Sequence, residues 1–276
     1  MTPTTSQSEK ADTFRALHVP GTPLFMPNAW DEGSARLFAS IGCAAIATTS
    51  GGFAVTRGRL DGAMTRDEVL AHSGDLTRAV DIPVSADLED CFAADPEGVA
   101  VTITDAIAQG LVGGSVEDFT RNRDDPIYEL GHATERVRAA AEAAHKGPVN
   151  FVLTARAENY LHGRKDLADT IARLQAYQEA GADVLFAPRV VDPTELRQLL
   201  GAVDVPVSVL ITPDAPTVGG LAELGVSRIS VGGAIAAAAY GFAVEAVKEL
   251  QQKGTASYWD RAGAAREAMV ASFVKP

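Results

Sequence analysis

The sequence is poor in cysteine, in basic residues and in long apolar runs. Cys43 and Cys91 are its only cysteines, so we expect no disulfide framework and a reducing, cytoplasmic compartment. The net charge of −12 argues against a nucleic-acid or membrane-surface partner, because such partners require basic patches. No segment approaches the roughly 20 apolar residues of a membrane span, and residues 1–10 lack an apolar signal segment. A small anionic ligand is not excluded, because a local site can be positive on an acidic protein.

Short apolar runs alternate with helical patterns along the chain. A glycine often separates the two, as Gly110 and Gly181 do, which is typical of the residue that follows a helix. In a second variant a proline begins the run, as at Pro83. The candidate strands are Leu24–Pro27, Ala44–Thr49, Val84–Asp87, Gly113–Glu117, Val149–Ala155, Val184–Ala187, Val207–Ile211 and Arg228–Val231.

This alternation predicts an α/β fold, a (β/α)8 TIM barrel. Strands separated by helices pair in parallel, and eight such units close a barrel. A doubly wound open sheet is the competing fold, but it usually has fewer strands, and no Gly-x-Gly-x-x-Gly fingerprint follows any run. We expect the barrel domain at residues 1–254, with 234–252 as its last helix. Residues 255–276 would form a helical extension, whose aromatic surface suggests packing on a neighbouring subunit.

Acidic residues stand at or beyond the C-terminal ends of three apolar runs. Asp87 and Glu89 follow the run that begins at Pro83, Glu117 ends the next run, and Asp61 lies in the glycine-rich loop after an earlier one. Carboxylates rarely lie near the end of a buried strand unless something offsets their repulsion and desolvation. A hard divalent cation does so with oxygen ligands. The sequence therefore predicts a metal-assisted active site at the C-terminal face of the barrel, where barrel enzymes place their chemistry.

Each candidate also has a purely structural interpretation. Asp87 and Glu89 could cap the helix that starts near Asp95, because acids are favoured at helix N-termini. Glu117 could form a loop salt bridge, and Arg156, at the end of another run, could be a solvated charge. The histidines show no spacing typical of zinc ligands.

Several motifs follow one another around the predicted barrel. They are Pro27-Asn28-Ala29-Trp30-Asp31 with Ser34-Ala35-Arg36, Thr49-Ser50-Gly51-Gly52 with Asp61, Ser85-Ala86-Asp87-Leu88-Glu89, Val116-Glu117-Asp118, Ala155-Arg156-Ala157-Glu158 and Glu179-Ala180-Gly181-Ala182-Asp183. Their order and spacing resemble the isocitrate lyase/phosphoenolpyruvate mutase superfamily over nearly the whole chain.

The resemblance implies a Mg²⁺ enzyme, with Mn²⁺ as an alternative ion, that makes or breaks a bond next to the carboxylate of a 2-oxo or 2-hydroxy acid. Asp87 would be the direct metal ligand, and Asp61, Glu89 and Glu117 would hold the ion's waters. Arg156, Asp61 and Glu117 would form the catalytic set. This role of a metal agrees with its general ability to stabilise an enolate.

The resemblance also implies how the substrate is held and how subunits assemble. The backbone of Ser50, Gly51 and Gly52 would bind the substrate carboxylate, and Arg156 would clamp it, since arginine recognises carboxylates through paired hydrogen bonds. A homotetramer or homodimer is expected, in which the helix at 256–273 is exchanged between subunits.

The chain departs from the lyase branch in the loop at 119–128. That branch carries Lys-Lys-Cys-Gly-His here, whereas this loop contains neither cysteine nor histidine. Asn122 is a candidate substrate ligand, with Arg121 or Arg123 as a cation. Asp90-Cys91-Phe92 stands where the family usually has Gly-Tyr or Gly-Phe, and Cys91 reaches a positive φ less easily than glycine. It could donate a proton, although a small buried filler is the simpler interpretation. His162 follows the fifth run and could reach the pocket, but a surface-loop position is the simpler expectation.

Three functions are compatible with these residues. The first is a Mg²⁺-dependent lyase that cleaves a C–C bond of a small 2-hydroxy or 2-oxo carboxylic acid through an enolate. The second is P–C bond chemistry on phosphonopyruvate, as a mutase or hydrolase. The third is a non-catalytic 2-oxo acid binding barrel, suggested by the loop that lacks the expected proton donor. All three predict a small anionic carboxylic acid as the partner.

Overall fold

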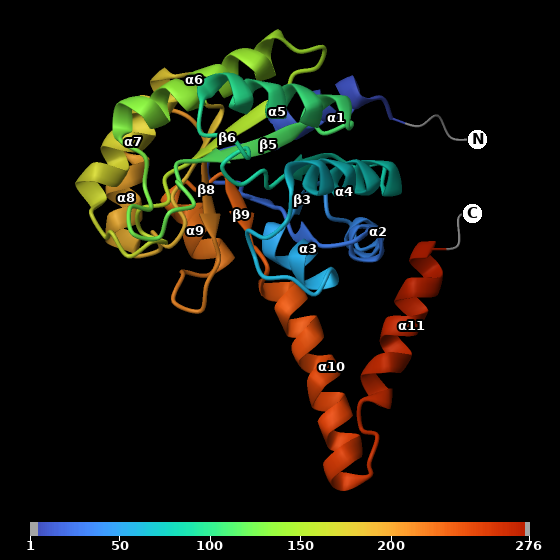
Figure 1. Cartoon of the computed structure of the whole chain (residues 1–276). Helices are drawn as coiled ribbons and strands as arrows, with labels where there is room; N and C mark the ends of the chain where they lie inside the picture. Colours follow the sequence, from blue (N-terminus) through green and yellow to red (C-terminus); the bar gives the residue numbers. More distant parts are fainter. Residues whose placement is uncertain (1–4, 274–276) are drawn as a thin grey trace.

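A parallel β-sheet forms the centre of the molecule, in a computed structural model that describes residues 5–273 (Figure 1). Its neighbouring strands follow the order β1-β9-β8-β7-β6-β5-β4-β3-β2, and every pair is parallel. The strands are β1 Leu24–Phe25, β2 Asn28–Ala29, β3 Ile46–Thr48, β4 Val84–Ala86, β5 Gly113–Glu117, β6 Val152–Arg156, β7 Val184–Phe186, β8 Val207–Leu210 and β9 Arg228–Ser230. The predicted parallel α/β fold is thus confirmed, and each predicted run overlaps a strand, but β2 lies in no predicted run.

The two outer strands of this order are almost continuous in the chain. Only Met26 and Pro27 separate β1, which pairs with β9, from β2, which pairs with β3. The buried side chain of Asn28, in β2, links β3 to the end of β9. Its Nδ2 donates to the Thr48 carbonyl at 2.7 Å, and its Oδ1 accepts from the Val231 N–H at 3.0 Å. The sheet therefore curls around, which is consistent with a TIM-like barrel.

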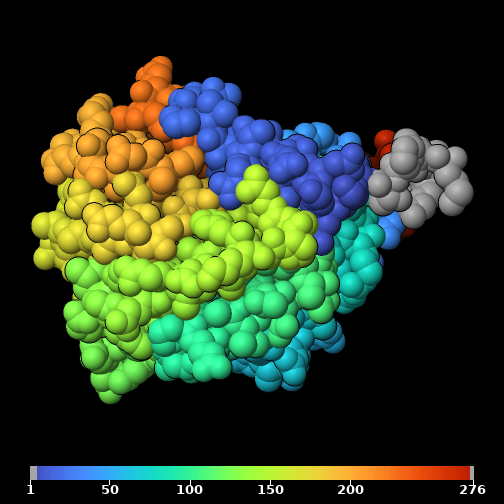
Figure 2. All heavy atoms as spheres, turned by 90° about the horizontal axis from the view of Figure 1, so that it is seen from above, coloured from blue at the N-terminus to red at the C-terminus, as the bar shows by residue number. Residues whose placement is uncertain are grey.

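Helices surround the sheet, and the chain passes around the molecule from blue through green and yellow to orange in Figure 2. They are α1 Gln7–Ala16, α2 Glu32–Ser40, α3 Ser50–Thr56, α4 Arg66–Ala79, α5 Pro96–Ala108, α6 Leu130–Lys146, α7 Leu167–Glu179, α8 Pro193–Leu200, α9 Val218–Leu224, α10 Ala234–Lys253 and α11 Trp259–Phe273. Among these helices, none is long and apolar enough to cross a lipid bilayer.

Helix α1 packs against the N-terminal part of the strands. Phe14 is fully buried in a cluster with residues that include Leu24 and Val152. A Cβ at Gly113 would lie 2.6 Å from the Phe14 ring, far inside normal contact. Gly113 thus relieves crowding, and α1 covers the end of the curled sheet opposite the predicted active site.

Helices α10 and α11 extend away from the barrel and form a V (Figure 1). The end of α11 returns to α2, where the Ser272 and Ser40 hydroxyls lie 2.7 Å apart. Both helices leave large apolar side chains exposed, among them Val244, Val247 and Trp259. The predicted C-terminal helix is present. Its exchange between subunits and the division at residue 254 stay predictions.

Candidate active site

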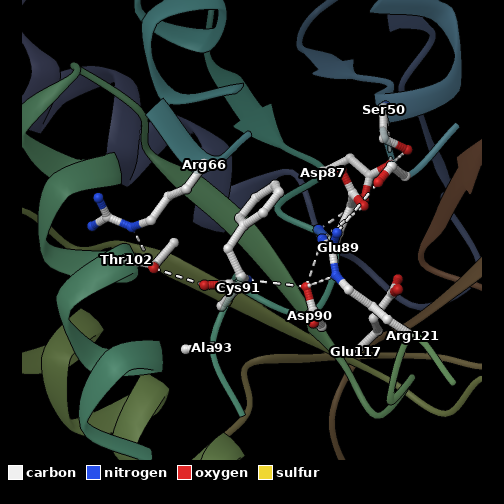
Figure 3. A network of polar contacts seen from close by, with 12 residues as sticks. Ser50, Arg66, Asp87, Glu89, Asp90, Cys91, Ala93, Thr102, Glu117 and Arg121 are labelled. Carbon is white, nitrogen blue, oxygen red and sulfur yellow. Dashed lines mark hydrogen bonds and ion pairs between the residues drawn. The ribbon is translucent and has the colours of Figure 1, made fainter. Parts of the chain in front are cut away.

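The predicted acids and arginine lie at one edge of the sheet. Asp87 follows β4, Glu117 ends β5 and Arg156 ends β6. Because the strands are parallel, their C-terminal ends meet at the same face of the barrel. Figure 3 shows Asp87, Glu89 and Ser50 pointing toward one another there.

Asp87 is held on both carboxylate oxygens. Its Oδ2 accepts from the Ser50 N–H at 3.2 Å and the Ser50 hydroxyl at 3.0 Å, and its Oδ1 accepts from Arg156 at 2.8 Å. Its own N–H donates to the Thr48 hydroxyl at 2.9 Å. The side chain is therefore oriented toward the loop after β3 and toward β6.

Arg156 connects three carboxylates. Its guanidinium lies 2.8 Å from Asp87, 3.1 Å from Glu117 and 2.8 Å from Glu158. Burial raises the pKa of both Glu117 and Glu158, and Arg156 opposes this rise. The interpretation of Arg156 as a solvated charge is therefore wrong, and Glu158 is the partner that orients its Nε.

Glu89 lies in a strained turn. Its φ is 52°, and Cys91 and Phe92 follow with φ of 58° and 56°, in the left-handed region that disfavours side chains. Thr102 fixes the turn, because its hydroxyl donates to the Cys91 carbonyl at 2.8 Å; in Figure 3 this contact lies on the opposite side of Cys91 from the acids. Such strain is retained where surrounding contacts hold it, and it is concentrated at functional sites.

The Glu89 carboxylate has one satisfied and one unsatisfied oxygen. Oε2 lies 3.0 Å from Arg121, whereas Oε1 is buried without a hydrogen-bond partner. Burial, and then the nearby charge of Asp87, raise the pKa of Glu89 to about 7. Arg121 also bonds Asp90 at 2.8 Å and covers the Phe92 ring at 4.7 Å, so it closes this side of the site.

Residues 50–52 form the first turn of the short helix α3 rather than an open turn. The Ser50 N–H is bonded to Asp87, and the Gly52 N–H donates to the Thr49 hydroxyl at 3.3 Å. A Cβ on Gly51 would lie 3.3 Å from the Asp61 carboxyl carbon. Asp61 therefore approaches the start of α3, as its predicted place in the site requires.

Two neighbouring cavities open around these residues. We call the first, of about 350 Å³, the mouth cavity; it is lined by Ser50, Asp61, Gly62, Glu89, Glu117, Phe119, Arg123, Arg156, Glu158, Leu161 and His162. We call the second, of about 120 Å³, the inner cavity; its lining includes Asp87, Arg156, Ser115, Thr154, Phe186 and Arg228. Arg156 borders both, so the two cavities meet at the acid cluster.

The contacts show which acids cap α5 and which acid of the pair Glu117-Asp118 faces the site. Asp95 caps α5 itself, accepting from the Gly98 N–H at 2.9 Å, so Asp87 and Glu89 are not that helix's cap. Asp118 is buried and bonds the Tyr177 hydroxyl at 2.6 Å. In the pair at 117–118, only Glu117 faces the mouth cavity.

Other candidates lie outside the two cavities. Asn122 turns its Oδ1 to the Asp124 N–H at 3.0 Å and lines neither cavity. The Cys91 thiol is fully buried, 3.8 Å from the Ser115 carbonyl, and burial raises its pKa, which fits a packing role.

Two residues that line the cavities were not assigned to the site from the sequence. His162 was expected in a surface loop, but it lines the mouth cavity and stacks on Phe119 with ring centroids 4.1 Å apart. Arg228 was included only as the start of an apolar run. An arginine beginning a buried strand was the available signal, and the inner cavity shows where it lies.

The donor set fits a hard cation in its chemistry. Asp61, Glu89, Glu117 and Glu158 offer only oxygen atoms to the mouth cavity, and the unsatisfied Glu89 Oε1 lacks a partner. Within residues 5–273, no three Asp, Glu, His or Cys side chains are arranged so that they could hold a metal ion together. Mg²⁺ commonly takes only one or two carboxylates directly and keeps several waters, so a sparse cluster suits it.

Comparison with known proteins identifies the family. The profile of phosphoenolpyruvate phosphomutase matches residues 14–251. The chain belongs to this family. It falls within the isocitrate lyase/phosphoenolpyruvate mutase superfamily, as its motifs predicted.

Relatives of the family include both lyases and mutases. The crystal structure of a protein described as a lyase/mutase from Burkholderia cenocepacia J2315 is 47% identical, with a TM-score of 0.93 and coverage of 98% of this chain and 97% of the other. A second, described as a phosphonomutase from the same organism, is 35% identical with a TM-score of 0.82 and coverage of 91% and 100%. The 2-methylisocitrate lyase of Escherichia coli K12 is 31% identical, covering 72% and 69% of the two chains.

Proposed function

We propose that this family member is a Mg²⁺-dependent lyase that cleaves a C–C bond of a small 2-hydroxy or 2-oxo carboxylic acid through an enolate. The observation that carries the proposal is the acid-lined mouth cavity, which meets the inner cavity at Arg156, where Arg156 pairs with Asp87. The lyase relative supports C–C rather than P–C chemistry. A cytoplasmic location agrees with the two free thiols at Cys43 and Cys91.

In this proposal the acids divide the work of holding the ion. Asp87 would be the direct ligand, exchanging its bond to Arg156 for the ion, while Asp61, Glu89 and Glu117 hold waters. Mn²⁺ would fit the same oxygen donors. Polarisation of the 2-oxo oxygen is the chemistry that the bound ion would supply.

The remaining residues would bind and orient the acid. Arg156, released from Asp87, would donate two hydrogen bonds to the substrate carboxylate or the enolate oxygen. The start of α3, at Ser50, Gly51 and Gly52, would hold the same carboxylate through backbone N–H groups, and those of Ser50 and Gly52 would have to leave Asp87 and Thr49 to do so. Asn122 would have to leave its bond with Asp124 to reach the substrate.

P–C bond chemistry on phosphonopyruvate is the second candidate. The relative described as a phosphonomutase favours it. So do the arginines of the loop after β5, because Arg123 lines the mouth cavity and Arg121 lies beside Glu89. Arginine suits the oxygens of a phosphonate as well as those of a carboxylate.

A substrate panel separates the two candidates. Release of pyruvate or glyoxylate from 2-hydroxy dicarboxylates would support the lyase, and release of phosphate from phosphonopyruvate would support the hydrolase. Asp87→Asn should lower kcat/KM by at least about 100-fold, since a catalytic metal contributes several kcal/mol. The exposed Asp125→Asn is the matched control and should retain activity. Full turnover in EDTA, or binding of 2-oxo acids without turnover of any substrate, would contradict the proposal.

We also propose that the enzyme is a homotetramer or homodimer in which α11 is exchanged between subunits. The exposed apolar side chains of α10 and α11, including Val247 and Trp259, support a partner surface. Light scattering that gives a monomer would refute it.

A further inference from the structure

The inner cavity contains a buried cation that has no carboxylate partner. Arg228, in β9, is 4% exposed, and no Asp or Glu of residues 5–273 forms an ion pair with it. Burial, and then the charge of Arg156, lower the pKa of Arg228 to about 9. A buried charge without a partner is costly, so an opposing charge is expected from something other than the described chain.

The neighbours of Arg228 are neutral. Its Nε donates to the Ser208 hydroxyl at 3.0 Å, its Nη2 donates to the Thr154 hydroxyl at 3.0 Å, and its Nη1 lies 3.4 Å from His18 Nε2. The Nδ1 of that histidine faces the Phe14 carbonyl at 2.8 Å, so Nε2 is the acceptor of a neutral ring. A guanidinium has five N–H donors, and donors therefore remain on both Nη atoms.

A second unpartnered group lines the same cavity. Ser115 is 8% exposed, and its Oγ is buried without a hydrogen-bond partner. Arg228, Ser115 and Thr154 all line the inner cavity, whose sides are apolar at Met26 and Phe186. Polar donors at one end, apolar walls and the acid cluster at the other end suit an elongated acid.

We propose that Arg228, together with the Ser115 and Thr154 hydroxyls, forms an anion-binding subsite inside the barrel that accepts a carboxylate. That carboxylate is either the far end of the substrate or a free small anion. The first assignment rests on the proposed function and makes the substrate a dicarboxylic acid. The binding of a free anion stands without it.

Calorimetric titration of the full chain in Mg²⁺ tests the subsite. Pyruvate and 2-oxoglutarate are the probes, because they share the 2-oxo acid and differ in the far carboxylate. Wild type should bind 2-oxoglutarate roughly 10- to 100-fold more tightly than pyruvate, as expected for a charge-assisted hydrogen bond. Arg228→Gln should remove this preference and leave the Kd for pyruvate unchanged.

Two serine-to-alanine variants provide a smaller change than Arg228→Gln as a second test of the subsite. Ser115→Ala should weaken 2-oxoglutarate binding roughly 2- to 10-fold. Ser227→Ala is the matched control, because its Oγ is also buried without a partner but does not line the inner cavity. It should bind like wild type.

Acetate distinguishes the two sources of the anion. If acetate raises the Tm of wild type but not of Arg228→Gln, while 2-oxoglutarate shows no preference over pyruvate, the subsite holds a free anion. If no anion, attached or free, distinguishes wild type from Arg228→Gln, the proposal is overturned. Failure of the proposed metal site would differ, because neither 2-oxo acid would then depend on Mg²⁺ while the acetate response would persist.

Discussion

Removal of the Arg156 guanidinium should destabilise the protein strongly. The side chain is 14% exposed and pairs with carboxylates that are 19%, 9% and 1% exposed, those of Asp87, Glu117 and Glu158. Breaking a buried pair by removing one partner costs about 3–5 kcal/mol, because the other charge stays buried and unpaired. We therefore expect Arg156→Gln to lower the free energy of unfolding by about that amount, out of a total that is typically about 5–15 kcal/mol.

The loss should depend on pH and on Mg²⁺. Burial already raises the pKa of Glu117 and Glu158, and without Arg156 both pKa values should rise further. A raised folded pKa means that stability is present at low pH and is lost as pH increases, so the deficit should grow from acidic to alkaline pH. Mg²⁺ should restore about 2.7 kcal/mol at a hundred times its Kd, and it should stabilise the variant more than the wild type.

Urea unfolding in EDTA and in Mg²⁺ measures both effects. The matched control is Arg164→Gln, because Arg164 pairs with Asp125 where the side chains are 47% and 75% exposed. That pair should contribute less than about 1 kcal/mol. If Arg156→Gln costs no more than Arg164→Gln, or if Mg²⁺ stabilises variant and wild type equally, the argument from buried charge is wrong.

Three further substitutions test single contacts. Gly52→Ala should lower the free energy of unfolding in urea by about 1–3 kcal/mol, because the Cβ of the introduced alanine would lie 2.5 Å from the Thr49 methyl. An unchanged free energy of unfolding would contradict this packing. Tyr177→Phe should cost about 1–3 kcal/mol, since it removes a buried donor from Asp118, and it should leave Mg²⁺ affinity unchanged. Burial lowers the pKa of His72 to about 4, so wild type should lose stability as pH falls from about 6.5 toward 4, by up to about 1.4 kcal/mol per pH unit. His72→Phe should flatten this dependence; an unchanged slope would assign it to other groups.

The local sequence pattern was sufficient to predict each described strand except β2, and to predict the face at which Asp87 and Glu117 meet. Each run that the sequence offered, such as Gly113–Glu117, overlaps a strand because apolar runs between helices are consistent with burial on both faces of a parallel sheet. The convergence of Asp87 and Glu117 followed from the rule that parallel strands end at one face. The acids could thus be placed near one another without coordinates.

Contacts between distant segments could not be predicted in the same way. The bonds from Arg156 to Asp87 and Glu158 depend on rotamers and on the register of β4, β5 and β6. The closeness of Arg228 to His18 depends on α1, which periodicity did not single out. Asn28 joins β2 to residues at 231–232 only after the sheet has curled. Contacts between side chains from distant segments could therefore be assigned only from the folded structure.

A crystal soaked with Mn²⁺ tests the central claim most directly, because the ion's anomalous scattering locates it. We predict one peak where the mouth and inner cavities meet, with an Asp87 oxygen as a direct ligand and with Asp61, Glu89 and Glu117 reaching it through waters. A well-ordered crystal of active enzyme with no peak at these residues, or with the peak elsewhere, would contradict it.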